Sequence, residues 1–179
     1  MPHNPTLFRD RADAGRRLAD RLVSLELNDP SVLAVPAGGV PVGAQIAQRL
    51  SAPLDLIIVR KIRIPWNPEA GFGAVTSGGD ALLNPRLTPV LGLNDTDIQR
   101  LADVARTEVA QRERIFRGER AHPALSGRTV ILVDDGLASG YTMLAAVRSV
   151  RRRGPSTIVV AVPAASGSAS ASITKKTIT

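Results

Sequence analysis

The chain has 179 residues, a length typical of one domain, and it contains no cysteine, which excludes a disulfide framework, a thiolate zinc site and a cysteine nucleophile. Its formal net charge of +7 favours an anionic partner, whereas an aromatic content of only 3% argues against the stacking surfaces of single-stranded nucleic-acid binders. No apolar run approaches the length that crosses a bilayer and the N-terminus lacks a secretory signal, so we expect a cytoplasmic protein with no membrane partner.

The first part of the chain alternates between helical and strand patterns. Apolar residues at helical spacing predict an amphipathic helix over residues 7–27, which we interpret as packing and not as chemistry. A short apolar run at residues 31–36, a glycine turn and a helical pattern at residues 40–50 predict a strand followed by a helix. Residues 54–59 are continuously apolar and predict a second strand, because a strand covered on both faces does not alternate.

Arg60 and Lys61 are expected to end this second strand, and the residues that follow differ in character. Proline and glycine are frequent over residues 62–84, and a turn signal at residues 77–80 separates two short apolar runs. This pattern predicts a mobile loop plus a β-hairpin.

The second half of the chain repeats the alternation. Asn94 is suited to cap a long charged helix that ends near residue 117. Residues 129–133 predict a strand, residues 141–153 a helix and residues 157–162 a last strand. Strands that alternate with helices predict an α/β fold with a parallel sheet.

The segment from Val130 to Thr142 combines two chemical functions. Asp134 and Asp135 follow a buried strand, and they can accept hydrogen bonds from the vicinal hydroxyls of a ribose or orient a hydrated metal ion. The small-residue loop and helix N-terminus beyond them can hold a phosphate through backbone N–H groups and hydroxyls. A ribose 5-phosphate satisfies both parts, and the residues predicted to bind it after the two acids are Gly136, Leu137, Ala138, Ser139, Gly140, Tyr141 and Thr142.

Three other kinds of site fit this segment less well. A P-loop needs a lysine before the Ser/Thr, where Tyr141 stands, and a dinucleotide-binding fold needs its acid about 20 residues further on. A phosphoacceptor receiver domain needs another aspartate downstream, and no Asp or Glu follows Asp135.

The same segment resembles the fingerprint of the type I phosphoribosyltransferases, which is an apolar strand, two acidic residues, a small-residue loop and a threonine that opens a helix. The resemblance extends over roughly residues 7–163 and looks closest to the bacterial and archaeal members without an assigned base. It implies a parallel twisted sheet flanked by helices, with a small hood that contains the hairpin of residues 62–84. It also implies that Asp134 and Asp135 bind the ribose hydroxyls of phosphoribosyl pyrophosphate, while the following loop binds its 5-phosphate.

The resemblance assigns further residues to the pyrophosphate group. Gly38 and Gly39 stand where these enzymes carry a pyrophosphate loop, and glycines allow the close backbone approach that an anion requires. The related enzymes usually have arginine where Ala37 stands. Arg60 and Lys61 resemble the Arg-Lys pair that precedes the hood in adenine-type enzymes. An ordinary turn for the glycines and a solvated strand end for the two cations remain the alternatives.

By the same resemblance, the hood closes over the reactive sugar and excludes water. Trp66 and Glu69 are candidates for substrate contacts there, although a surface or packing role explains each of them at least as well. The arginines at residues 151–153 could contact nucleic acid, but cations in a final helical turn complement the helix dipole, and we prefer that interpretation.

The function that the resemblance implies is transfer of a phosphoribosyl group from phosphoribosyl pyrophosphate to a nitrogen acceptor, with Mg²⁺ as cofactor and pyrophosphate as product. Asp134 and Asp135 would hold the Mg²⁺ indirectly, through water or the ribose hydroxyls. Ala138 stands where hypoxanthine and guanine enzymes usually carry a catalytic acid, which favours adenine, uracil or another acceptor. Two alternatives stay open: a regulator that senses phosphoribosyl pyrophosphate or a nucleotide without turnover, and a nucleic-acid binder.

We expect one domain over residues 1–163 and a tail rich in Ser, Ala and Thr over residues 164–179 that is poorly ordered. The related fold normally continues with further sheet after the strand at residues 157–162. A second subunit could cover an edge exposed there, so a homodimer is an expected assembly.

Overall fold

The computed structural model describes residues 8–137 and 140–165. Its elements, in chain order, are α1 (Arg11–Val23), β1 (Pro30–Ala34), α2 (Gly39–Leu50), β2 (Leu54–Leu56), β3 (Val59–Ile64), β4 (Asn67–Thr76), β5 (Ala81–Leu83), the 3₁₀ helix η1 (Thr88–Leu91), α3 (Asp95–Phe116), β6 (Thr129–Val133), α4 (Tyr141–Arg151) and β7 (Thr157–Ala161). Within this described part, no helix combines the length and apolar character that a membrane crossing requires.

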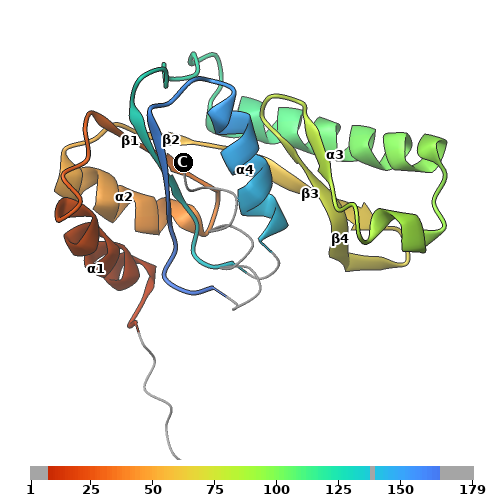
Figure 1. Cartoon of the computed structure of the whole chain (residues 1–179), viewed down its shortest axis with the longest axis horizontal. Helices are drawn as coiled ribbons and strands as arrows, with labels where there is room; N and C mark the ends of the chain where they lie inside the picture. Colours follow the sequence, from red (N-terminus) through yellow and green to blue (C-terminus); the bar gives the residue numbers. More distant parts are fainter. Residues whose placement is uncertain (1–7, 138–139, 166–179) are drawn as a thin grey trace, which may run out of the picture.

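The main sheet has four parallel strands in the order β2-β1-β6-β7. Helices α1 and α2 lie on one side of it and α4 lies on the other (Figure 1). Successive side chains of a strand point to opposite faces, so Leu132 packs in the core with α4, whereas Ile131 and Val133 pack in the core with α1 and α2. Every residue of β6 is buried because β6 is an inner strand with both faces covered. The parallel α/β fold predicted from the sequence is confirmed.

A second sheet, here called the hood sheet, has three antiparallel strands in the order β3-β4-β5. The long helix α3 runs along it, at the end of the molecule away from α1 and α2 (Figure 1). A separate apolar core fills the space between α3 and this sheet, with Phe72 and Ile62 fully buried in it. The hood sheet is therefore a packed unit next to the main sheet.

The strand predicted over residues 54–59 is wrong in its extent. It is divided into β2 and β3, which belong to different sheets. The run is continuously apolar because Ile57 packs in the core beneath α4, whereas Ile58 packs in the core of the hood sheet. The N–H of Ile57 still bonds to the main sheet at Ala34 O, while Ile58 O accepts the N–H of Ser77 after β4. The chain thus passes from one sheet to the other between these two isoleucines.

The hairpin predicted within residues 62–84 is confirmed as β4 and β5, with the turn at residues 77–80. The mobile loop expected before it is wrong. Residues 59–76 instead form a hairpin of β3 and β4, in which Ile62 and Ile64 are buried and Arg63 is exposed. The proline and glycine content concealed this alternation of buried and exposed residues.

The remaining elements lie close to their predicted positions. Asn94 caps α3 as expected, because its side chain accepts the backbone N–H of Asp97 at 2.9 Å. Helix α1 is shorter than predicted and begins at Arg11, after the N-cap Asp10. Of the tail expected over residues 164–179, only Ala164 and Ala165 are described, and Ala165 forms a parallel bridge with Leu137. Residues 166–179 lie outside the described part.

Candidate functional site

A cavity of about 600 Å³ lies where the carboxyl edge of the main sheet meets the hood sheet. Its lining comes from the start of α1, the loop after β1, the strands β3 and β4, and the loop between β6 and α4. The lining residues are Arg11, Val35, Pro36, Gly38, Val59, Arg60, Lys61, Arg63, Pro68, Glu69, Asp134, Asp135, Gly136, Leu137, Gly140 and Thr142.

Asp134 follows the last residue of β6, and its carboxylate is held close to the backbone. The N–H of Asp135 donates to Asp134 Oδ1 at 2.8 Å. Burial is the main cause that raises the pKa of Asp134 from 3.8 to about 6, and the negative charge of Asp135 raises it further. Asp134 is therefore an acceptor whose charge is sensitive to pH just below neutrality.

Asp135 is ion-paired with a residue from the other end of the chain. Arg11 Nε lies 2.8 Å from Asp135 Oδ2 and Arg11 Nη2 lies 2.7 Å from the same oxygen. The sequence did not single out Arg11, because the opening helix was interpreted as packing. Arg11 is nevertheless the first residue of α1, and its exposed side chain lines the cavity.

The loop after β1 approaches the two acidic residues closely. A β-carbon on Gly38 would stand 2.3 Å from Asp135 Oδ2, and one on Gly39 would stand 2.6 Å from Val133 O. A side chain at either position would clash with other atoms of the protein, so both positions require glycine. Gly38 lines the cavity, whereas Gly39 is buried against β6. The peptide bond between Pro36 and Ala37 is cis, and the side chain of Ala37 is exposed.

The predicted phosphate loop lines the cavity through Gly136, Leu137, Gly140 and Thr142. Gly140, the N-cap of α4, has no side chain and so supplies no side-chain cap to the first N–H groups of this helix. The N–H of Leu137 donates to Ala164 O at 2.9 Å, which makes it unavailable to a phosphate.

Two more of the predicted loop residues, Ala138 and Ser139, lie outside the described residues. Tyr141 is the first residue of α4 and is half-buried, but it does not line this cavity.

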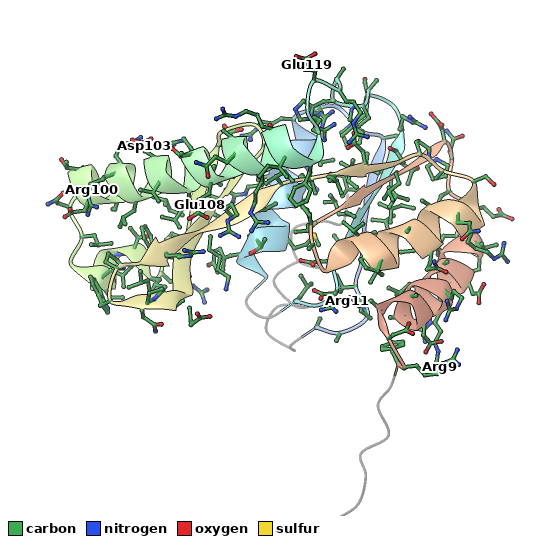
Figure 2. All side chains as sticks on the ribbon, turned by 180° about the vertical axis from the view of Figure 1, so that it is seen from behind. Arg9, Arg11, Arg100, Asp103, Glu108 and Glu119 are labelled. Atoms are coloured by element: carbon green, nitrogen blue, oxygen red, sulfur yellow. The ribbon has the colours of Figure 1, made fainter. Side chains whose placement is uncertain are left out.

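Arg60 and Lys61 reach the cavity from inside β3, and the prediction that they end a strand of the main sheet is wrong. Arg60 is engaged by Glu108 of α3, with both Nε and Nη2 at 2.6 Å from Oε2. Figure 2 shows Glu108 on the side of α3 that faces the hood sheet. Arg63, which the sequence did not single out, also lines the cavity and lies 3.7 Å from Glu108 Oε1.

Trp66 and Glu69 were the two candidates for substrate contacts in the hood, and only one of them lines the cavity. Glu69 lines the cavity, and its backbone oxygen accepts Lys61 Nζ at 3.3 Å. Trp66 lies in the turn between β3 and β4, is 64% exposed and is not among the lining residues. A substrate contact therefore remains a candidate role for Glu69 and loses support for Trp66.

The lining mixes both signs of charge, and its described residues include four cationic side chains and three carboxylates. Such a site suits a ligand with anionic groups at some positions and neutral hydroxyls at others. Among the described residues, no three His, Cys, Asp or Glu side chains gather to hold a metal ion by themselves. Mg²⁺ usually binds through one or two carboxylates together with substrate phosphates, and the Asp134–Asp135 pair fits that kind of site.

Comparison with protein families gives a match to almost the entire chain. The model of the phosphoribosyl transferase domain family matches residues 8–178. Two provisionally named phosphoribosyl transferases from two strains of Mycobacterium tuberculosis are each 40% identical over 157 residues, which is 88% of this chain and 35% of theirs. The chain thus spans about a third of the length of these curated relatives.

Solved structures agree with this match. The crystal structure of TT1426 from Thermus thermophilus has a TM-score of 0.76 and 41% identity, over 94% of this chain and 80% of that one. A purine phosphoribosyltransferase from Pyrococcus horikoshii has a TM-score of 0.53 and 18% identity, over 89% of this chain and 76% of that one. At the latter identity the likeness concerns the fold alone.

Proposed function

The chain belongs to the phosphoribosyl transferase domain family, and from that premise we propose that it binds phosphoribosyl pyrophosphate in the cavity between its two sheets. There it transfers the phosphoribosyl group to a nitrogen acceptor and releases pyrophosphate. The observation that carries the proposal is the convergence of the Asp134–Asp135 pair, the Gly38 loop and the start of α4 on one cavity. These three features supply what a diol, a pyrophosphate and a 5-phosphate respectively need.

The acidic pair serves the sugar. Ionised carboxylates accept hydrogen bonds from vicinal hydroxyls, and their charge favours a ribose ring that becomes positive as its C1–O bond loosens. Asp134 is suited to this role above pH 6, because its raised pKa leaves it mostly protonated at lower pH. A positively charged sugar is stabilised by fixed charges and requires no covalent bond to the protein.

The start of α4 serves the 5-phosphate. Gly140 has φ of 75°, a conformation that glycine adopts without strain, and it turns the chain from the loop into the helix. The backbone N–H groups of the first helical turn and the Thr142 hydroxyl can then donate to phosphate oxygens, aided by the helix dipole. A mixed site of this kind fixes both ends of the sugar and so orients C1.

Mg²⁺ is part of the proposal, with Asp134 and Asp135 as the residues that would hold it, directly or through water and the ribose hydroxyls. When bound, the ion supplies positive charge that stabilises the departing pyrophosphate. The hood sheet bounds the cavity on the other side and limits the access of water to the reacting sugar.

The test is calorimetric titration of phosphoribosyl pyrophosphate with Mg²⁺, followed by assay of pyrophosphate release with adenine, uracil and a panel of other nitrogen acceptors. The proposal expects binding, and release that depends on one acceptor. The double variant Asp134→Asn/Asp135→Asn should weaken binding by at least about a hundredfold, since two charge-assisted contacts are removed. Unchanged binding by this variant would refute the assignment.

The same experiment separates the alternative of a regulator. Tight binding with no pyrophosphate release under any acceptor would indicate a sensor of phosphoribosyl pyrophosphate or a nucleotide.

A further inference from the structure

We propose that Arg11, the first residue of α1, is a pyrophosphate-binding residue of the cavity. This assignment rests on the proposed function and deepens it. It concerns a residue outside the loop after β1 and outside the hood, from a helix that contributes no other lining residue to this cavity. Figure 2 shows Arg11 on the inner side of α1, whereas Arg9 lies at the outer edge of the molecule.

The first argument is the position of the guanidinium. Arg11 holds Asp135 through Nε and Nη2, and the carboxylate of Asp135 also touches the backbone of Gly38. The side chain of Arg11 therefore ends beside the loop that is the candidate pyrophosphate site. A pyrophosphate placed against this loop comes within reach of the same guanidinium.

The second argument concerns hydrogen-bond capacity. Both contacts with the carboxylate use Asp135 Oδ2, and the Arg11 side chain is 60% exposed. A guanidinium carries further N–H donors in a planar fork that matches phosphate oxygens. Arg11 can thus keep its contact with Asp135 and still donate to an anion in the cavity.

The third argument is electrostatic. An anion next to Asp135 would be repelled by its carboxylate unless a cation stands between them. The other cations of the lining come from β3 of the hood sheet, where Glu108 engages Arg60 and Arg63. Arg11 is the cation of the described lining that lies on the main-sheet side, directly on the acidic residue.

The fourth argument is that α1 is held firmly enough to aim this side chain. Gly15 lies one turn after Arg11 on the same helix face, and a β-carbon there would stand 2.7 Å from Val42 O of α2. Asp10 caps the helix by accepting the N–H of Asp13 at 2.7 Å. The close packing at Gly15 positions the start of α1 against α2, and the cap at Asp10 orders its first turn.

The experiment is calorimetric titration of the full chain with two probes, inorganic pyrophosphate and ribose 5-phosphate, each with Mg²⁺ present. The variants are Arg11→Gln and Arg11→Lys, and Arg21→Gln is a control that removes the same charge from the exposed far end of α1. Thermal melts check that each variant folds, as expected for a side chain that is mostly exposed.

We expect Arg11→Gln to weaken pyrophosphate binding by about ten- to a hundredfold, the effect of losing a charge-assisted contact, and to change ribose 5-phosphate binding by less than about threefold. Arg11→Lys should recover part of the loss because it keeps the charge without the planar fork. Arg21→Gln should match the wild type. Equal losses of affinity for both probes in Arg11→Gln would instead indicate a structural role and would overturn the proposal. So would an unchanged affinity for pyrophosphate in this variant, or a wild type that does not bind pyrophosphate.

The two proposals can fail separately. If Arg11→Gln loses pyrophosphate but phosphoribosyl pyrophosphate binds no more tightly than pyrophosphate itself, the proposed function fails and the anion site stands. If phosphoribosyl pyrophosphate is bound and turned over while Arg11→Gln keeps full pyrophosphate affinity, the function stands and the role of Arg11 is refuted.

Discussion

Gly38 and Asp135 are in such close contact that a β-carbon on Gly38 would stand 2.3 Å from Asp135 Oδ2. The backbone of Gly38 has φ of −64°, which an alanine adopts easily. The glycine is thus required for space and not for its conformational freedom. The loop after β1 and the acidic pair after β6 consequently behave as one packed unit at the sheet edge.

Gly38→Ala should therefore impair both the site and the fold. The added methyl must push the Asp135 carboxylate aside, and we expect ribose 5-phosphate affinity to fall by at least about tenfold. Overpacking should cost about 1–3 kcal/mol in the free energy of unfolding, measured with urea. Gly78→Ala is the control, since its nearest neighbour at 3.2 Å is the exposed carboxylate of Asp80, which does not line the cavity. Normal affinity in Gly38→Ala would show that this contact does not position Asp135.

The raised pKa of Asp134 predicts how stability depends on pH. Burial moves this pKa from 3.8 to about 6, so the folded chain binds a proton more tightly than the unfolded chain. The contribution of Asp134 to stability is therefore greatest below the lower value, falls as the pH rises through this interval, and levels off above it. Asp134→Asn removes the effect and should stabilise the protein at pH 7 relative to the wild type.

Urea unfolding of both proteins at pH 5 and pH 7 measures this difference, because the other titrating groups contribute equally to each. The stability gain of Asp134→Asn should be larger at pH 7 than at pH 5. A gain that is the same at both pH values would contradict the raised pKa. At pH 7 the wild type should bind ribose 5-phosphate more tightly than Asp134→Asn does. This difference in affinity should shrink as the pH falls below 6, because Asp134 then becomes protonated in the wild type.

Local signals in the sequence account for the elements that were predicted well. The cap at Asn94, the buried run of β6 and the acidic pair after it each depend on residues within a few positions of one another. The parallel sheet followed from the alternation of such elements. The fingerprint after β6 indicated the family, and the chain's match to the family model confirms it.

Contacts between distant segments account for what the sequence did not reveal. Ile57 and Ile58 are adjacent and equally apolar, and only tertiary packing assigns them to different cores. Arg11 lies 124 residues from its partner Asp135, and its position depends on how α1 packs against α2. A signal was present in Gly15, a glycine inside a helical pattern, which often marks a close approach of another element.

Gly15→Ala tests that approach directly. An alanine inside a helix normally gains up to about 1 kcal/mol over glycine, but here its β-carbon would stand 2.7 Å from Val42 O, which is backbone and cannot move alone. We expect a net loss of about 1–3 kcal/mol in the free energy of unfolding, together with weaker pyrophosphate binding as Arg11 is displaced. Arg21→Ala, at an exposed position of the same helix, should change stability by less than about 0.5 kcal/mol. Stabilisation by Gly15→Ala would mean that α1 is free to shift on α2.

The buried ion pair at the end of α3 provides the largest expected effect on stability. Arg117 donates from Nη1 to Asp55 Oδ2 at 2.8 Å and from Nη2 to Leu56 O at 2.9 Å, so it ties α3 to β2 at the edge of the main sheet. Its side chain is only 7% exposed. Arg117→Met should cost about 3 kcal/mol, because it leaves the partly buried Asp55 carboxylate without its partner.

The control for Arg117→Met is Arg114→Met, which removes the same charge one turn earlier at an exposed position of α3 and should cost less than about 0.5 kcal/mol. Adding Asp55→Asn to Arg117→Met should recover roughly 1 kcal/mol, since the stranded charge is removed. Urea unfolding of the four proteins measures all of these differences. If Asp55→Asn lowers stability further in the Arg117→Met background, the loss arises from packing around the guanidinium and not from the unpaired carboxylate.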